Sequence, residues 1–205
     1  IATEEGQAVI RRLVMQSDVL VENFKVGDMA RYGLDAATLR ALHPRLVYCS
    51  ITGFGQDGPY AQRAGYDVAI QGLGGLMSIT GAADGEPQKV GVAVTDLFTG
   101  MYATVAILAA LRHRDATGEG QAIDMALLDA QVAMLANLGS HYLVGGEVPA
   151  RQGNAHANIV PYQVFAVADG HIIVAVGNDR QFARLCELLG LAALGQDARF
   201  ATNAG

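Results

Sequence analysis

The sequence contains little cysteine. Its 205 residues include two cysteines, Cys49 and Cys186, which lie far apart and form no CxxC pair. This spacing argues against a disulfide framework and against a structural zinc site. The five histidines form no HxxxH or other close ligand pair, so no metal centre is expected either. Cys49 lies in the apolar run LVYCSI and is predicted to be a small core residue.

Clusters of positive charge are also missing. The chain has 14 Lys and Arg against 20 Asp and Glu, which gives a net charge of −6 without a long acidic run. A nucleic-acid surface needs clustered Lys and Arg. Nucleic acid is therefore not an expected partner.

No apolar run is long enough to suit a typical membrane span. The most apolar stretch, residues 97–111, has fifteen residues, fewer than a spanning helix needs. We therefore predict a helix buried in protein and no membrane partner. The polar start IATEEGQAV shows no signal peptide and no initial Met, so we expect a cytoplasmic protein and a chain cut at both ends.

The apolar residues that are present follow an α/β pattern. They make up 51% of the chain, enough to bury a substantial core. Their spacing predicts helices over residues 4–16 and 35–43, each followed by a buried strand, DVLVEN and then RLVYCSI. This alternation indicates parallel α/β units. Further predictions are a glycine-interrupted helix over 66–79, a long helix opened by Asp96, a strand after Gly120, a helix over 127–143, a hairpin at Asp169 and Gly170, and a last helix near 180–189.

Two common catalytic motifs are absent, and a third is incomplete. The chain has no Walker A sequence and no GxSxG elbow. GFGQDG at residues 53–58 matches GxGxxG after a strand, but Pro59 and the polar YAQRAGYD follow where an apolar helix should pack. We interpret this segment as a turn-rich loop that can still approach a ligand closely.

Two loops carry candidate binding residues. In VENFKVGDMARYG, Asn23, Phe24 and Lys25 follow a strand, at the end of the sheet where ligands bind in open α/β folds. Lys25 and Arg31 offer charge for phosphates, although an ordinary surface loop is the alternative. The loop GGEVPARQGNAHANIVPY is long, as functional loops often are. It contains His156, for which a functional and a solvated role both stand open.

Asp96 is the one charged residue in VGVAVTDLFTGMYATVAILAAL, residues 90–111. As a helix cap, its side chain would accept a backbone N–H bond. As a nucleophile, it would be held ionised by the positive helix end and would attack an activated acyl group. Apolar surroundings would then exclude water. The residues alone leave both roles open.

Four motifs in order resemble the class III CoA-transferases, the CaiB–BaiF family. They are DVLVENFKVGDMARYGLD, VYCSITGFGQDGPYAQRAGYD, KVGVAVTDLFTGMYA and GNAHANIVPYQVFAVADG. The resemblance covers nearly the whole chain. GYDVAIQGLGGLMSITG and NIVPYQVF are most similar to the dicarboxylate branch, such as the succinyl-CoA:hydroxymethylglutarate CoA-transferases.

The resemblance implies transfer of coenzyme A from an acyl-CoA donor to a small dicarboxylic acid. Asp96 matches the nucleophile, which forms aspartyl anhydride and aspartyl-CoA thioester intermediates without ATP or a metal. Tyr66 and Asp67 match positions beside it, and a second carboxylate there is expected to raise the pKa of one partner. The glycine loop matches QGNAHAN, residues 152–158, with fewer glycines than in the formyl-CoA transferases. The remaining catalytic candidates are Gly153, Asn154 and His156, and the CoA-binding candidates are Asn23, Phe24, Lys25, Arg31, Tyr32 and Arg63.

The resemblance also implies a fold and an assembly. The expected fold is α/β, with a truncated Rossmann-like parallel-sheet domain over residues 1–140, an active-site loop and linker over 141–160, and the start of a smaller α+β domain over 161–205. Family members are about twice this long and form interlocked homodimers.

Two alternative functions are kept. The family includes α-methylacyl-CoA racemases, whose acid/base pair uses a His in a GHD motif. This chain has GYD, with Tyr66 at that position, and an unperturbed Tyr is a poor base near neutral pH. The second alternative is a non-catalytic CoA-binding or dimerisation fragment.

Overall fold

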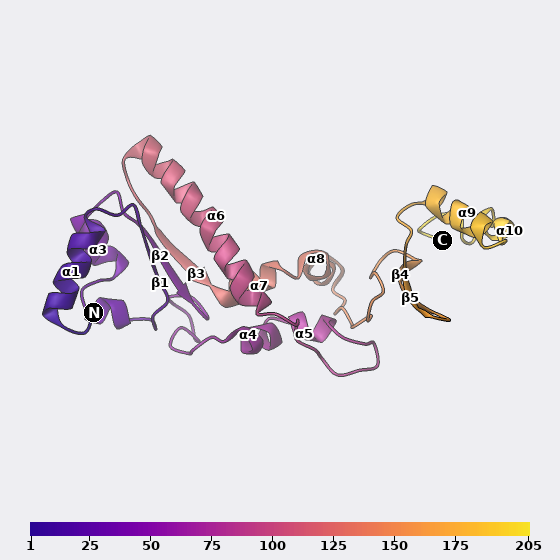
Figure 1. The fold of residues 1–205 in the computed structure, drawn as a ribbon, viewed down its shortest axis with the longest axis horizontal. Coiled ribbons are helices and arrows are strands. Elements are labelled where there is room, and N and C mark those ends of the chain that lie inside the picture. The colour runs from indigo at the N-terminus through magenta and orange to yellow at the C-terminus, as the bar shows by residue number, and fades with distance from the viewer. The chain divides into compact units, whose positions relative to one another are not determined.

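The computed structural model describes residues 1–205, which divide into two compact units. The first unit comprises residues 1–78 and 89–149, and the second comprises residues 79–88 and 150–205. Figure 1 labels the elements of both, and each unit is described by itself. The change of unit at residues 149–150 falls inside the 141–160 segment predicted to be a loop and linker.

The first unit is built on a parallel sheet of three strands in the order β1-β2-β3 (Figure 1). They are β1 (Val19–Glu22), β2 (Val47–Thr52) and β3 (Ala122–Ala126). Val21 lies opposite Cys49, and Cys49 lies opposite Ile123. The predicted parallel pairing is therefore confirmed, and Cys49 is a buried residue of the central strand.

Short helices cover the start of this sheet. They are α1 (Glu4–Val14), α2 (Asp28–Arg31) and α3 (Ala36–Leu42). The expected cap is confirmed, because the Asp35 carboxylate accepts a hydrogen bond from the backbone N–H of Thr38 at 3.0 Å. Burial of apolar surface drives these helices onto the sheet, in a core cluster of Val14, Met29, Leu34, Leu39, Leu46 and Tyr48.

Two segments predicted as single helices are each divided in two. The first forms α4 (Asp67–Leu73) and α5 (Leu76–Ile79), separated by Gly75, whose φ of 89° is left-handed. The second forms α7 (Leu127–Ala133) and α8 (Ala136–Gly145), and Ala136 at the break has a φ of 48°. Ala is the strongest helix former, so the local sequence gives no sign of this second break.

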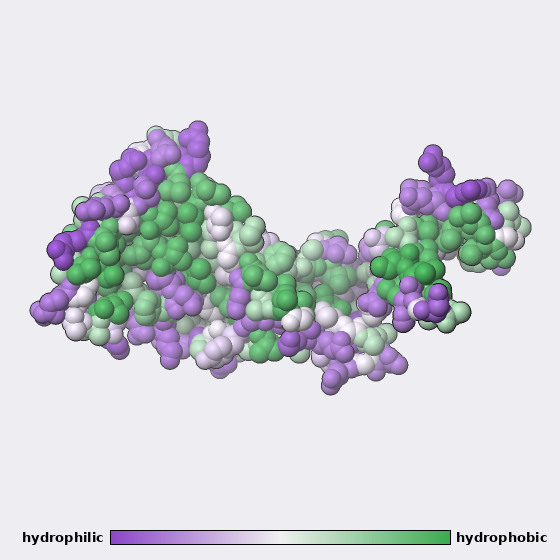
Figure 2. Space-filling model, in the orientation of Figure 1, coloured by the Kyte–Doolittle hydropathy of each residue, from purple (hydrophilic) through white to green (hydrophobic).

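The long helix α6 (Val94–Thr117) differs from its prediction in length and in burial. It spans 24 residues, and it is long and apolar enough to cross a membrane by length and composition alone. The expectation that it is buried is wrong for this chain, since only 22% of its most apolar window is buried. Figure 2 shows apolar atoms along this helix, and the exposed ones belong to Leu97, Phe98, Met101, Tyr102, Val105 and Leu108.

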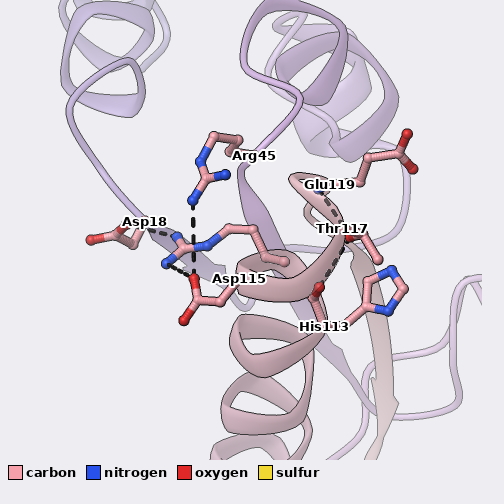
Figure 3. A network of polar contacts seen from close by, with 7 residues as sticks. Asp18, Arg45, His113, Asp115, Thr117 and Glu119 are labelled. Carbon is pink, nitrogen blue, oxygen red and sulfur yellow. Dashed lines mark hydrogen bonds and ion pairs between the residues drawn. The ribbon is translucent and has the colours of Figure 1, made fainter.

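A polar network fastens the C-terminal end of α6 to the start of β1 (Figure 3). The guanidinium of Arg114 donates to Asp18 at 2.7 Å and to Asp115 at 3.3 Å. The hydroxyl of Thr117 donates to the carbonyl of His113 at 3.0 Å and accepts from the N–H of Glu119 at 3.2 Å. These contacts fix the turn that leads from the helix into β3.

The second unit contains a two-stranded antiparallel sheet and two helices. The predicted hairpin is confirmed as β4 (Tyr162–Val167) and β5 (Gly170–Ala175), with Val167 opposite Gly170. The predicted last helix is α9 (Asp179–Leu188), and α10 (Ala192–Gly195) follows it. Arg151 joins residues 79–88 to this unit by donating to the carbonyl of Gly85 at 2.7 Å.

Candidate active site

Asp96 lies in the first turn of α6 but does not cap it. The helix begins at Val94, its N-cap residue is Ala93, and that residue contributes no side-chain bond. Asp96 is therefore the third helical residue, and its interpretation as the cap is wrong. The carboxylate is left available for other chemistry.

The helix is capped instead by Asp67, the first residue of α4. Its Oδ2 atom accepts the backbone N–H of Thr95 at 2.8 Å and that of Asp96 at 3.3 Å. Two of the unpaired N–H groups at the start of α6 thereby find a partner 28 or 29 residues away in the sequence. The negative charge also lies at the positive end of the helix.

Gln71 holds Asp67 in this position. Its Nε2 donates to the other carboxylate oxygen, Oδ1, at 2.6 Å, and its Oε1 accepts the N–H of Val90 at 2.9 Å. Gln71 is fully buried. The chain Val90–Gln71–Asp67 therefore ties the segment before α6 to the helix that caps it.

Asp96 is electrostatically perturbed. Partial burial and, secondly, the negative charge of Asp67 raise the pKa of Asp96 above its ordinary value. The expectation that a neighbouring carboxylate raises the pKa of one partner is confirmed. The helix end alone predicts a lowered pKa, and that direction is wrong, because burial of Asp96 and, secondly, the charge of Asp67 raise the pKa.

Asp96 lines a cleft of about 480 Å³ in the first unit. Its walls come from the ends of β1 and β2, the loop at residues 53–65, and the starts of α4, α6 and α7. The two ends of this loop are in contact at Gly53 and Gly65, since a Cβ on Gly53 would lie 2.5 Å from the Cα of Gly65. The lining residues are Asn23, Ile51, Gly53, Gly65, Tyr66, Asp67, Asp96, Thr99, Gly100 and Leu127.

A smaller cavity of about 130 Å³ shares four lining residues with this cleft, Asn23, Gly53, Gly65 and Tyr66. It brings together Asn23, Phe24, Lys25 and Arg63, and no carboxylate lines it. Asn23 is fixed by donating to the carbonyl of Ile51 at 2.6 Å. Two cations in a cavity that no carboxylate lines suit an anionic ligand such as a phosphate.

Arg31 and Tyr32 lie elsewhere in the first unit. They line neither cavity. Arg31 is exposed and donates to the Tyr32 hydroxyl at 3.3 Å, and Tyr32 packs against the core cluster. The structure therefore groups four of the six CoA-binding candidates and leaves these two apart.

The remaining candidates, Gly153, Asn154 and His156, belong to the second unit. The N–H of Gly153 donates to the carbonyl of Gly81 at 3.0 Å, and that of His156 donates to Tyr162 at 2.8 Å. Nδ1 of His156 accepts the N–H of Asn158 at 3.0 Å. The N–H of Asn154 forms no hydrogen bond, so it is the one among these three positions that is free to bind an oxyanion.

Comparison with known proteins decides the family. The model of CoA-transferase family III matches residues 1–205, the whole chain. The chain belongs to this family.

Relatives within it are close. A succinate–glutarate CoA-transferase from Agrobacterium fabrum is 60% identical over 98% of this chain and 50% of its own. A succinyl-CoA:glutarate CoA-transferase from Homo sapiens is 45% identical over 97% of this chain and 45% of its own. The solved structure of a CaiB/BaiF family protein from Brucella suis has a TM-score of 0.82 and 56% identity, over 98% of this chain and 53% of that one. The chain spans about half the length of these relatives.

The prediction that this chain is most similar to the succinyl-CoA:dicarboxylate branch is confirmed, because both of these relatives are CoA-transferases that act on glutarate. Sequence reasoning missed Gln71, Gly65 and Gly100. Gln71 lies four residues after Asp67 on α4, a spacing at which Gln and Asp side chains meet, and this signal was available. The contact of Gly65 with Gly53 depends on the folding of a loop and has no local signal.

Proposed function

We propose that the protein containing this chain transfers coenzyme A between succinyl-CoA and a small dicarboxylic acid such as glutarate, with Asp96 as the nucleophile. One observation carries the assignment. Because Asp67 caps α6, the Asp96 carboxylate is free at the wall of a cleft that adjoins a cationic cavity. The names of the similar CoA-transferases supply the acids.

The reaction requires four attacks at carbonyl carbon. The Asp96 carboxylate attacks the donor thioester, which gives a mixed anhydride and CoA thiolate. The thiolate attacks the aspartyl carbonyl, releasing the donor acid and leaving an aspartyl-CoA thioester. The acceptor carboxylate displaces the thiolate to form a second anhydride. Attack of the thiolate on the acceptor acyl carbon then releases the new acyl-CoA and restores Asp96.

The first unit supplies binding and positioning for these steps. Lys25 and Arg63 pair with CoA phosphates, and Phe24 offers an apolar face beside them. The roles of Arg31, Tyr32 and the glycine-loop candidates Gly153, Asn154 and His156 remain predictions from the family resemblance. So does a Rossmann-like whole domain.

The experiment traps the covalent enzyme. The full-length protein is incubated with succinyl-CoA and then with hydroxylamine or borohydride, and the modified peptide is identified by mass spectrometry. We expect modification at Asp96, and loss of transfer in Asp96→Ala and Asp96→Asn. Asp169→Asn, at the exposed hairpin turn, is the matched control and retains transfer. Transfer that survives Asp96→Ala sinks the proposal, and solvent deuterium at the acyl α-carbon would favour the racemase.

We further propose that the full-length protein is a homodimer, as the family resemblance implies. The exposed apolar side chains of α6 support further protein packing on this helix, because soluble proteins rarely leave so large an apolar patch open. Light scattering is expected to give a dimer for the wild type and a folded monomer for Val105→Glu with Leu108→Glu. A monomeric wild type, or an unchanged dimer in the variant, argues against a second copy on this face.

A further inference from the structure

Gly100 occupies an unusual place in α6. It lies four residues after Asp96 in the same helix, and both residues line the 480 Å³ cleft. A glycine inside a helix destabilises it relative to alanine, because the unfolded chain has more freedom to lose. Gly100 therefore needs a reason beyond the helix itself.

The first unit provides no such reason. Apart from the adjoining residues and the backbone of the helix itself, no atom lies within 4 Å of the position that a Cβ on Gly100 would take, and its φ is not left-handed. Gly53 differs, because a Cβ there would lie 2.5 Å from backbone. Neither conformation nor packing within this unit excludes a side chain at residue 100.

The open space at Gly100 adjoins Asp96. Side chains on a helix lean toward its N-terminus, so a residue covers the turn before its own Cα. A methyl group at residue 100 would therefore project over the turn that carries Asp96. The neighbouring wall is fixed, since Thr99 is buried and its hydroxyl donates to the carbonyl of Thr95 at 2.7 Å.

From this geometry we infer that Gly100 determines acyl specificity. The missing side chain leaves room beside Asp96 for the methylene chain of the acyl group that the aspartyl anhydride carries. The inference rests on the proposed function. In this inference the acyl group is an extended aliphatic dicarboxylic chain, such as succinyl or glutaryl. Its methylene groups lie over residue 100.

The test uses full-length Gly100→Ala, with Gly91→Ala as the control. Gly91 also has open space around its Cβ position and lies outside the cleft. With succinyl-CoA as the donor, kcat/KM is measured for oxalate, malonate and glutarate, and for isotopically labelled succinate, whose exchange into succinyl-CoA is followed by mass spectrometry. For Gly100→Ala we expect a loss that grows with chain length, to tenfold or more for glutarate, together with an unchanged or higher Tm. Gly91→Ala is expected to match the wild type.

Three results overturn the inference while leaving the proposed function intact. One is unchanged transfer by Gly100→Ala. The second is an equal loss for every acid, and the third is a lower Tm, which would mean that protein fills the space. A wild-type enzyme that transfers no CoA overturns the proposed function, and this inference with it.

Discussion

The Oδ2 atom of Asp67 lies 3.3 Å from the backbone nitrogen of Asp96 and accepts its N–H. The same oxygen accepts the N–H of Thr95 at 2.8 Å. One carboxylate thus caps the helix that presents another. This pairing frees the side chain of Asp96, and it also places a negative charge close enough to raise the pKa of Asp96.

Removal of the Asp67 cap is expected to destabilise the protein. Asp67→Ala leaves two helix N–H groups without their partner, and loss of a capping side chain costs about 1 kcal/mol. Asp67→Asn keeps one acceptor oxygen for these N–H groups but turns its Nδ2 donor toward the Nε2 donor of Gln71, so it should retain the cap and lose the bond to Gln71. Denaturant unfolding of the full-length variants measures both free energies. Equal stability of Asp67→Ala and the wild type would contradict the capping role.

The pH dependence of transfer should follow the pKa of Asp96. In the proposed mechanism only the ionised carboxylate of Asp96 attacks, so transfer is expected to fall as pH decreases through this raised pKa. Asp67→Asn removes the like charge, which lowers the pKa of Asp96 and moves the acid limb of kcat/KM to lower pH. The limb stays above the ordinary aspartate range, because burial is the larger cause of the shift. An acid limb that moves to higher pH in Asp67→Asn would refute this assignment.

Gln71 is expected to act as a positioning residue. Gln71→Leu leaves Oδ1 of Asp67 and the N–H of Val90 without their partner. Both groups are partly buried, so the cost lies toward the lower end of about 1–3 kcal/mol for each. Because the cap then shifts, kcat should fall about 10- to 100-fold. KM for succinyl-CoA should change little, since Gln71 does not line the cationic cavity.

The control for Gln71 is Gln131→Leu on α7. Gln131 is equally buried, but neither atom of its amide has a hydrogen-bond partner. Replacing it with leucine is expected to be neutral or stabilising, because no bond is lost. Steady-state kinetics and unfolding curves compare the two variants. Similar losses of kcat in both would show that Gln71 acts only through general packing.

The contact between Gly53 and Gly65 is expected to limit substitution. A Cβ at residue 53 would lie 2.5 Å from backbone, and neither chain segment is a flexible side-chain end. Gly53→Ala should cost about 1–3 kcal/mol through overpacking and weaken CoA binding, because the 53–65 loop lines both cavities. Gly91→Ala provides the comparison, and calorimetry of CoA binding gives the affinity. Unaltered affinity and stability in Gly53→Ala would show that the loop adapts.

Much of the fold follows from local sequence signals. The spacing of apolar residues predicts α1, α3 and the strands of the parallel sheet. A segment that buries its apolar side chains adopts the helix or strand whose geometry brings those side chains into the core. The cap at Asp35 and the hairpin at Gly170 need only residues a few positions apart. The motif order also identifies the family, and residues 1–205 match its model.

Other features depend on contacts between distant residues. The helix break at Ala136 has no sequence signal. The exposure of α6 is set by the elements that pack against it, and these cannot be read from its own residues. A sequence pattern shows that a helix is apolar, whereas burial depends on the neighbours that the chain provides.

Asp96 combines both kinds of information. The sequence alone predicts a lone carboxylate at the start of an apolar helix, in a motif that resembles the CoA-transferases. That this carboxylate is not the cap depends on the folded chain. Helix N–H groups donate to any acceptor that folding brings near, and here the acceptor is Asp67, 29 residues earlier in the chain.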